Sequence, residues 1–258
     1  MPETARVRQV YDDIGRSYLA TRRPDPRIAR VIRAALGDAR SVVNVGAGAG
    51  SYEPPDLSVL AIEPSREMLR QRPAGAARAL QAVAEALPLR DATVDAALAV
   101  LTLHHWHDPA RGLAEMSRVS RRRVVVVTWD PAAKRQFWLT SHYFPEIVEL
   151  DLPRFPAIET FSRRLPNVQV EPLPIPRDCV DGFLGAFWCR PEAYLSPAVR
   201  QAISGFALLA PGVADAGLTR LAADLESGRW DARFGALTRA PSADLGYRVV
   251  TAEKGSAS

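Results

Sequence analysis

The sequence of 258 residues contains little cysteine, almost no lysine and no long apolar run. Its two cysteines, Cys179 and Cys189, are too few for a disulfide framework and lack metal-finger spacing, so we expect two reduced thiols. No apolar stretch approaches the roughly 20 residues that a membrane-spanning helix needs. The first residues include no apolar segment of the kind that marks a secretory signal. These absences predict a cytoplasmic, globular protein with no membrane partner.

Lysine occurs only at Lys134 and Lys254, and the other basic residues of the chain are arginines. The formal net charge is +4, but the arginines are scattered among carboxylates, and their densest cluster, residues 121–123, precedes a predicted strand. Proteins that bind nucleic acids gather their positive charge into a patch or stripe. We therefore expect no nucleic-acid partner. The preference for arginine, together with abundant alanine, indicates a GC-rich bacterial genome.

Four short, continuous apolar runs punctuate the first half of the chain at a spacing that suits alternating strands and helices. The runs are Ser41–Val45, Leu57–Ile62, Thr93–Leu101 and Arg123–Thr128. The segments that we expect to be helical are Pro26–Leu36, the segment that starts at Ser65, and Asp108–Val119. Continuous apolar strands are buried on both faces, which is typical of a parallel sheet covered by helices. The pattern predicts a doubly wound α/β fold.

The pattern changes after Asp130, where proline and aromatic residues become dense. We expect an edge strand at Val168–Ile175, because its prolines exclude it from the sheet interior, and a last strand at Leu245–Thr251. The expected helices are Phe137–Leu150 with a break at Pro145, Asp178–Trp188, Pro197–Leu209 and Gly217–Leu225. This order predicts a helical cap inserted near the C-terminal strands. The aromatic residues form either the core of the cap helices or an apolar wall for a ligand, and periodicity does not separate the two.

A glycine-rich loop follows the first strand directly, with Gly46, Gly48 and Gly50 at every second position. Glycine lets the backbone turn sharply and lets a ligand approach closely. A dinucleotide-binding loop has the spacing G-x-G-x-x-G and leads into a helix. Here the third glycine comes one position early, the prolines at 54–55 exclude a long helix, and Glu53, with no Lys or Arg nearby, would repel a pyrophosphate. The loop therefore suits a ligand without phosphate and disfavours the alternative of a nicotinamide-dependent oxidoreductase.

Three further segments are expected at the same edge of the sheet, because the carboxyl ends of parallel strands form one ligand crevice. Glu63 ends the second strand and is placed to accept two hydrogen bonds from a ribose diol; the alternative is an exposed loop carboxylate. The segment Ala84–Pro88 forms a turn before the third strand. The segment Leu101–Pro109, with the motif Leu-His-His-Trp-His, follows that strand. This edge is therefore the candidate site.

Taken together, the glycine loop and the motifs Glu-Pro-Ser, Ala-Glu-Ala-Leu-Pro and Leu-His-His-Trp resemble the class I S-adenosylmethionine-dependent methyltransferases. The resemblance is to the small-molecule group related to the ubiquinone/menaquinone- and biotin-pathway enzymes, and it covers residues from about 11–130. It implies a Rossmann-like, mostly parallel seven-stranded sheet, and S-adenosylmethionine as the cofactor with S-adenosylhomocysteine as its product. It also implies an N-terminal lid at residues 1–25, a cofactor-binding core at 26–130, and the remaining strands with a helical substrate cap at 131–258.

The resemblance implies a role for each matching residue. For the cofactor these are Gly46, Ala47, Gly48 and Gly50 at the methionine part, Glu63 at the ribose hydroxyls, Pro64 and Met68 at the adenosine, Ala84 and Glu85 at the adenine edge, and the Leu101 backbone behind the sulfonium. Tyr11 is implied as a lid residue and Arg23 as a partner of the methionine carboxylate. Asn44 and Val83 stand where acidic residues are typical of the family. These departures leave open a protein that binds the cofactor without methylating.

Methyl transfer from a sulfonium is an in-line displacement, which proximity and exclusion of water accelerate most. A general base helps when the acceptor is a hydroxyl or an acidic carbon. His104 and His105 are the catalytic candidates, because histidine titrates near neutral pH; the alternative for both is structural packing. We expect no metal site. The expected partner is a small, largely apolar acceptor, methylated at O, N or C, and the protein is expected to be a monomer or a homodimer.

Overall fold

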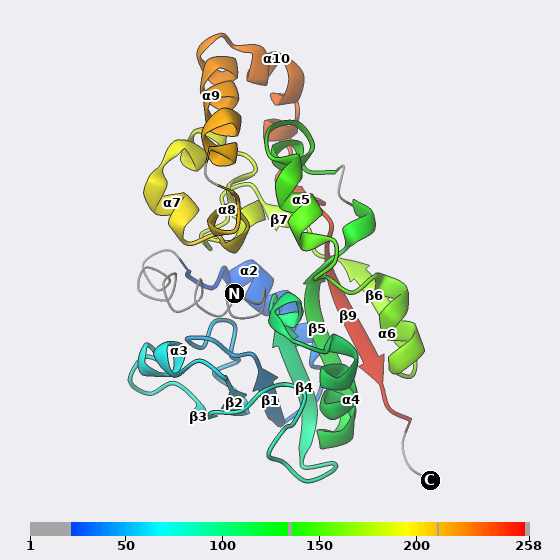
Figure 1. Ribbon diagram of the computed structural model, residues 1–258. Coiled ribbons are helices and arrows are strands. Elements are labelled where there is room, and N and C mark those ends of the chain that lie inside the picture. The colour runs from blue at the N-terminus through cyan, green and yellow to red at the C-terminus, as the bar shows by residue number, and fades with distance from the viewer. Residues whose placement is uncertain (1–21, 134–135, 211, 256–258) are drawn as a thin grey trace. The chain divides into compact units, whose positions relative to one another are not determined.

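The computed structural model describes residues 22–133, 136–210 and 212–255 (Figure 1). This part of the chain divides into two compact units. The sheet unit comprises 26–130, 154–172 and 247–255, and the helical unit comprises the described residues of 1–25, 131–153 and 173–246. No described helix combines the length and the apolar character that crossing a membrane requires.

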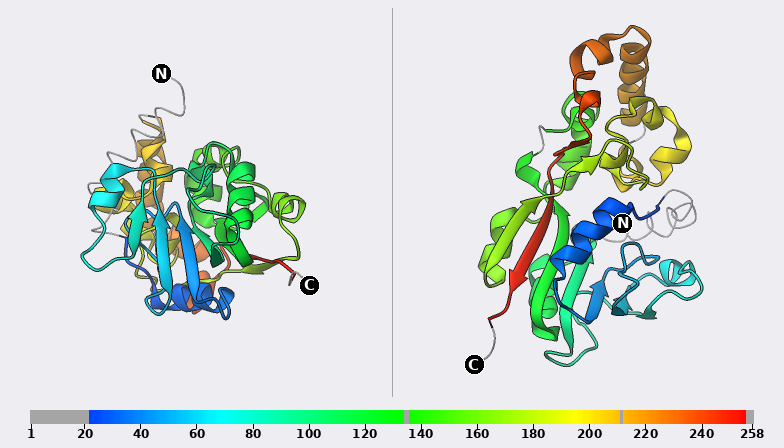
Figure 2. Two further views of the ribbon diagram at one scale, coloured as in Figure 1. Left: turned by 90° about the horizontal axis from the view of Figure 1, so that it is seen from below. Right: turned by 180° about the vertical axis from the view of Figure 1, so that it is seen from behind.

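One seven-stranded sheet forms the centre of the sheet unit (Figures 1 and 2). Its strands, in spatial order, are β3 (Arg78–Leu80), β2 (Ser58–Ile62), β1 (Ser41–Val45), β4 (Val94–Val100), β5 (Ser120–Trp129), β9 (Tyr247–Glu253) and β6 (Val168–Pro172). Neighbouring strands from β3 to β5 are parallel, and β9 runs antiparallel to both β5 and β6. The predicted mostly parallel, seven-stranded sheet is confirmed. Because the strand order proceeds outward from β1 in both directions, a topological switch point lies between β1 and β4.

Helices cover both faces of this sheet, which explains why its central strands are continuously apolar. On one face, α4 (Pro109–Val119) and α6 (Ile158–Arg164) pack their apolar side chains on alternate residues of β1, β4 and β5. On the other face, α2 (Pro26–Ala35) lies against β5 and β9 (Figure 2). Helix α4 has the predicted start, since the Asp108 carboxylate accepts a hydrogen bond of 3.0 Å from the Arg111 N–H.

Two features of the sheet unit differ from the predictions. β5 begins at Ser120, so arginines 121–123 lie inside the strand and not before it. They are held there by ion pairs with carboxylates of Asp95, Asp38 and Glu253, which compensate their charge. β3 and α6 were not predicted, because β3 is three residues long with mostly exposed side chains and α6 is a seven-residue helix beside prolines.

The helical unit consists of short helices joined by irregular segments. Its elements are 3₁₀ helices at Pro131–Ala133, Leu184–Phe187, Pro191–Leu195 and Leu237–Arg239, a π-helix at Leu139–Tyr143, α5 (Pro145–Asp151), α7 (Pro197–Gln201), α8 (Ser204–Ala207), α9 (Val213–Glu226) and α10 (Arg229–Phe234). Strands β7 (Ile175–Pro176) and β8 (Ser242–Ala243) form a small antiparallel sheet. The predicted break at Pro145 is present, because a π-helix ends before it and α5 starts there.

The predicted helix over Asp178–Trp188 is wrong, since only a 3₁₀ turn occurs in its second half. Side chains hold this backbone in a non-helical path. The Asp181 carboxylate accepts hydrogen bonds from its neighbour Gly182 N–H at 2.7 Å and from the Arg22 guanidinium at 2.8 Å. The Trp188 indole N–H donates to the Ile175 carbonyl at 3.0 Å. These contacts depend on residues far along the chain, which periodicity does not detect.

The aromatic residues of the helical unit form its core. Trp188, Trp230 and Tyr194 are among the largest fully buried side chains of the described chain. Trp138 contacts Tyr194 and Trp230 edge to face, with ring centroids 5.8 and 5.2 Å apart. The core alternative therefore holds for these rings. Both cysteines are free; Cys179 is completely buried, and its burial raises the pKa of the thiol to about 12.

Candidate cofactor site

The glycine loop after β1 packs directly against the segment after β4, at the topological switch point. Gly46, Gly48 and Gly50 have φ values of +71°, +54° and +100°, a region that side chains with a Cβ rarely adopt. The N–H groups of Gly46 and Ala47 both donate to the Ile62 carbonyl, at 2.8 and 3.0 Å. A Cβ at Gly46 would lie 2.1 Å from Thr102 Oγ1. The loop therefore has room for glycine but not for a larger residue at position 46, because Thr102 packs directly on its backbone.

Glu63 is buried at the end of β2, with 7% of its surface exposed, so it is not an exposed loop carboxylate. Its Oε2 accepts a hydrogen bond of 2.8 Å from the Gly48 N–H, and its Oε1 accepts one of 2.9 Å from the Ser65 N–H. Burial raises the pKa of the Glu63 carboxyl, while the two backbone hydrogen bonds and the positive charge of Arg72 lower it. Each carboxylate oxygen retains a lone pair for a further donor.

Glu53 has a cationic partner, Arg72, that lies 19 positions away in the sequence. Arg72 Nη2 lies 3.0 Å from Glu53 Oε1 and 2.7 Å from Oε2, and both side chains are less than 10% exposed. Asn44 Nδ2 also donates to Glu53 Oε1, at 3.2 Å. The expectation that Glu53 is unbalanced is therefore wrong, and its charge is no argument against a phosphate ligand. The absence of a helix in residues 46–57 still separates this loop from a dinucleotide-binding loop.

Of the residues implied for the adenosine, the structure brings Met68 closest to the loop. Met68 belongs to α3 (Arg66–Arg70), which Ser65 caps as predicted, and its Cε lies 3.3 Å from where a Cβ at Gly48 would be. Pro64 is exposed. Ala84 lies in the core beneath α4, and the Glu85 carboxylate accepts a hydrogen bond of 3.0 Å from the Asp108 N–H.

The end of β4 shows backbone strain beside the glycine loop. Leu101 has φ +50°, an unusual value for a residue with a branched side chain, and its N–H donates to the Val127 carbonyl at 2.8 Å. A 3₁₀ helix over Leu103–His105 follows. Strained backbone of this kind gathers at functional sites. It agrees with the backbone role that the resemblance implies for Leu101.

An aromatic stack lies at the ends of β4 and β5. The His104 ring stacks on Phe155 with centroids 4.3 Å apart and 17° between planes, and the His105 ring lies 3.6 Å from that of His104. Phe155 meets Trp129 edge to face at 5.6 Å. Both histidines are half-buried. Phe155 was missed from the sequence because it lies in a proline-flanked loop without periodicity.

Two further predicted residues, Tyr11 and Arg23, do not belong to the described part of the sheet unit. Tyr11 lies outside the described residues, as do most of the implied lid residues. Arg23 is exposed and belongs to the helical unit, where its neighbour Arg22 makes the ion pair with Asp181. Within the described ranges, no group of three or more His, Cys, Asp or Glu side chains is arranged to hold a metal ion.

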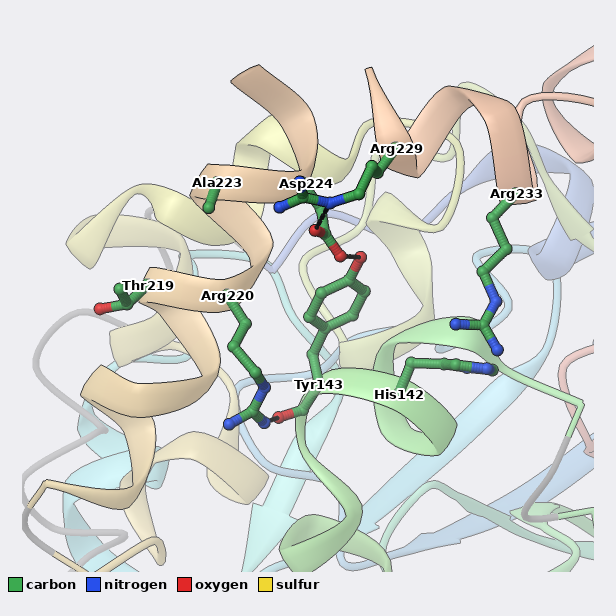
Figure 3. Close-up of a pocket in the computed structure, with 8 residues that line it drawn as sticks. All are labelled: His142, Tyr143, Thr219, Arg220, Ala223, Asp224, Arg229 and Arg233. Carbon is green, nitrogen blue, oxygen red and sulfur yellow. Dashed lines mark hydrogen bonds and ion pairs between the residues drawn. The ribbon is translucent and has the colours of Figure 1, made fainter. Parts of the chain in front are cut away.

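The helical unit has a groove of about 310 Å³, but its lining is charged (Figure 3). Asp224 accepts hydrogen bonds from the Tyr143 hydroxyl at 2.8 Å and from Arg229 Nε at 2.7 Å. Arg220 donates to the Tyr143 carbonyl at 2.6 Å. Burial, together with the nearby Arg233, lowers the pKa of His142. Such a groove is unsuited to an apolar ligand, so the aromatic wall expected in this half of the chain does not line it.

The sheet unit, in contrast, fits the parts of S-adenosylmethionine. Glycine backbone with positive φ and no Cβ suits a close approach of the methionine part, and the adjacent Glu63 carboxylate suits a ribose diol. A buried thioether beside both, from Met68, offers an apolar contact for the adenosine. All three features come from segments that follow β1 and β2.

Comparison with known proteins agrees with this fit. Residues 43–128 match the family model of the methyltransferase domain. A putative methyltransferase from an antibiotic biosynthesis pathway of Anabaena variabilis is 32% identical, superimposes with a TM-score of 0.81, and the match covers 89% of this chain and 97% of that chain.

More distant matches agree. A possible histamine N-methyltransferase of Thermotoga maritima, 16% identical with 95% of this chain and 92% of that chain covered, shares the fold with a TM-score of 0.52. Uncharacterized methyltransferases of Mycobacterium bovis and Mycobacterium tuberculosis are 38% identical over 109 residues, which is 39% of this chain and 44% of each relative. The chain thus matches less than half the length of these curated relatives. With its fold, its glycine loop and a full-length structural relative in agreement, the chain belongs to the class I S-adenosylmethionine-dependent methyltransferases.

Proposed function

We propose that the protein transfers a methyl group from S-adenosylmethionine to a small, largely apolar metabolite. The observation that carries this proposal is the position of Glu63. Its buried carboxylate accepts a hydrogen bond of 2.8 Å from the Gly48 N–H. The group proposed to bind the ribose and the loop proposed to bind the methionine part are therefore in direct contact. Glu63 and the loop would hold the two ends of the cofactor, and Leu101 ends the neighbouring strand β4 beside them.

When bound, S-adenosylmethionine supplies a methyl group on a positively charged sulfur, which an electron-rich acceptor atom displaces in line. The residues of the chain align and enclose the reactants. Glu63 accepts hydrogen bonds from the ribose hydroxyls, and the loop 46–50 lets the methionine part approach the backbone. Leu101, with its left-handed backbone, turns the chain at the end of β4. Tyr11 and Arg23 remain proposed contacts of the methionine part.

The acceptor surface that we propose is the stack of His104, Phe155 and Trp129. Its rings come from three segments and form a half-buried aromatic cluster at the ends of β4 and β5. A small planar or isoprenoid acceptor would contact it by the same stacking that joins the rings. In this proposal His104, within the stack, or His105, whose ring lies 3.6 Å from it, accepts the proton that a hydroxyl or acidic carbon releases.

Titration calorimetry with S-adenosylhomocysteine tests the cofactor half of the proposal. Glu63→Ala should weaken binding by about 1.5–3 kcal/mol, the range for hydrogen bonds to a charged group. Glu67→Ala is the matched control, because Glu67 lies on α3, is one-third exposed and bonds to Arg70 and Gln71. Unchanged affinity in Glu63→Ala would remove the ribose role.

A methyl-labelled donor and a panel of small apolar phenols, amines and isoprenoids test the acceptor half. Phe155→Ala should lower turnover at least tenfold while the affinity for S-adenosylhomocysteine stays unchanged, whereas Leu80→Ala, at an exposed position of the same unit, should change neither. Transfer only to bulk RNA, DNA or protein would contradict the substrate class. Tight cofactor binding without transfer to any acceptor would favour the alternative that Asn44 suggests, a cofactor-binding protein that does not methylate.

A further inference from the structure

We propose that Arg72 is a positioning residue of the cofactor site, whose guanidinium fixes the glycine loop and Glu53 in the arrangement that the cofactor requires. This inference rests on the proposed function and deepens it. Arg72 lies just after α3, outside the motifs that indicate the family, and it has no expected contact with the cofactor.

The guanidinium is packed against the loop from the side of α3. Its Nη1 makes a long hydrogen bond of 3.4 Å to the Gly48 carbonyl, and its Nη2 donates to the Ala77 carbonyl at 3.0 Å. A Cβ at Gly50 would lie 3.2 Å from Nη1. The Gly48 residue is therefore held from both ends, with its N–H bonded to Glu63 and its carbonyl to Arg72.

Arg72 also joins β1 to the loop. Its Nη2 contacts both oxygens of the Glu53 carboxylate, which in turn accepts a hydrogen bond from Asn44, the residue before the last of β1. The side chains of Arg72 and Glu53 are 6% and 9% exposed. A buried guanidinium that makes contacts to two carbonyls and a carboxylate has a single conformation, since each alternative loses several hydrogen bonds at once.

The charge of Arg72 acts on Glu63 as well. Burial is the largest influence on the Glu63 pKa and raises it, and Arg72 is the described charged group that lowers it. The ionised carboxylate accepts more hydrogen bonds than the protonated acid, so cofactor affinity should fall as the pH falls through the raised pKa. Without the cation, that pKa rises further, and the fall should begin at a higher pH.

The test compares variants that change the charge without leaving it unpaired. Arg72→Met alone would bury Glu53 without a partner and risks unfolding, so we combine it with Glu53→Gln, because neutral replacement of both members of a buried pair is often tolerated. A second double variant, Glu53→Gln with Arg72→Lys, restores the cation without the planar fork. Arg70→Met is the control, since Arg70 is the last residue of α3, two positions before Arg72, is 74% exposed and pairs with Glu67 at the surface.

Two measurements are made on each variant: carbon NMR titration of the Glu63 carboxyl without ligand, and the affinity for S-adenosylhomocysteine against pH. In the Met/Gln variant we expect binding at neutral pH to be at least tenfold weaker and the Glu63 carboxyl to titrate at a higher pH than in the parent. In the Lys/Gln variant, the pH at which Glu63 titrates should return most of the way to that of the parent, but the affinity should recover only in part. Arg70→Met should match the parent in both measurements.

The outcomes separate this inference from the proposed function. In one outcome, the parent protein and the Met/Gln variant bind S-adenosylhomocysteine equally and Glu63 titrates at the same pH in both. Arg72 then merely neutralises Glu53, so the inference is wrong while the proposed function stands. If the parent itself binds neither S-adenosylmethionine nor its product, the proposed function fails, and the cofactor role of Arg72 fails with it.

Discussion

The sheet unit and the helical unit both bury polar side chains, but they use them differently. In the sheet unit, Asn44, Glu63 and Thr102 are buried just at the ends of β1, β2 and β4, where the sheet ladder already satisfies the adjacent backbone. In the helical unit, Asp181 and the Trp188 indole bond to backbone groups of irregular segments. The carboxylates differ in the donors that they already hold: each oxygen of Glu63 accepts one backbone N–H and has a lone pair for a ligand, whereas Asp181 Oδ1 accepts both Gly182 N–H and Arg22.

Backbone strain is distributed just as unevenly. Among the described residues, the non-glycine residues with positive φ are Tyr52, Ala92, Leu101 and Asn167, all in the sheet unit. Two of them, Tyr52 and Leu101, lie beside the glycine loop and at the end of β4. In the helical unit the positive φ values belong to glycines that precede or follow helices and strands, such as Gly212 before α9. Two of these four strained residues therefore lie beside the cofactor site, and the other two, Ala92 and Asn167, precede the strands β4 and β6.

Trp188→Ala tests whether the aromatic residues of the helical unit serve packing alone. The indole is 1% exposed and donates to two carbonyls, so its removal should lower the free energy of unfolding by about 3–5 kcal/mol. Chemical denaturation measures the loss, and the affinity for S-adenosylhomocysteine of the folded protein should not change. Val180→Ala, at a 52% exposed position of the same unit, should cost little. If Trp188→Ala is as stable as the parent but binds S-adenosylhomocysteine more weakly, the indole serves ligand binding and not packing.

Gly46→Ala is the corresponding test in the sheet unit. The added Cβ would lie 2.1 Å from Thr102 Oγ1, so the loop must shift, and we expect binding of S-adenosylhomocysteine to weaken at least a hundredfold, about 2.7 kcal/mol. Gly75→Ala separates the clash from strain, because Gly75 also has positive φ, at +84°, but its Cβ would meet nothing within 4 Å. Gly75→Ala should lose about 1–2 kcal/mol of stability and keep its affinity. Equal binding losses in both variants would show that the contact with Thr102 is irrelevant.

Much of the fold could be predicted because its signals are local. The apolar strands and the caps of α3 and α4, Ser65 and Asp108, are set by residues within a few positions. β3 could not be predicted, since three residues with exposed side chains carry no pattern. The helix expected over 178–188 failed because Arg22, 159 positions away, holds the Asp181 carboxylate, and the Trp188 indole bonds to the carbonyl of Ile175, which lies outside the segment.

The candidate site divides in the same way. Glu63 and the glycine loop could be placed together, because the carboxyl ends of adjacent parallel strands meet at one edge. Arg72 and Glu53 lie 19 positions apart in the sequence, with β2 and α3 between them, so only the folded structure reveals their pairing. Phe155 reaches His104 from a loop 51 positions later, and no motif marks it.

Asp95→Asn probes the opposite end of the sheet from the cofactor site. Asp95 Oδ2 accepts hydrogen bonds from the N–H groups of Arg40 and Ser41, each at 3.0 Å, and these bonds, the Arg40 one first, lower the pKa of the carboxyl to about 2. Because the folded pKa lies below the unfolded one, this stabilisation is complete above the unfolded value of 3.8 and is lost as the pH falls toward 2. The variant should be less stable by about 1–2 kcal/mol at neutral pH.

Urea unfolding at several pH values measures this difference, which should shrink steadily below pH 4. Cofactor affinity should stay unchanged, since Asp95 begins β4 and the site lies where β4 ends. A difference in stability that is independent of pH would mean that the Asp95 carboxylate contributes through packing and not through its charge.

Tyr143→Phe carries the comparison to the charged groove of the helical unit. The hydroxyl donates to Asp224 at 2.8 Å, and burial, reinforced by that carboxylate, raises the pKa of Tyr143. Asp224 keeps Arg229 as a partner when the hydroxyl is removed, so the loss of stability should be only about 0.5–1.5 kcal/mol. Arg229→Met should cost less still, because Arg229 is 65% exposed and its ion pair is screened by water.

Removing both partners of Asp224 should cost more than the two single losses together, because the carboxylate then has neither donor. Calorimetric unfolding of the two single variants and the double variant measures that coupling. If either single variant instead weakens cofactor binding or methyl transfer, the groove takes part in function and the helical unit is more than packing.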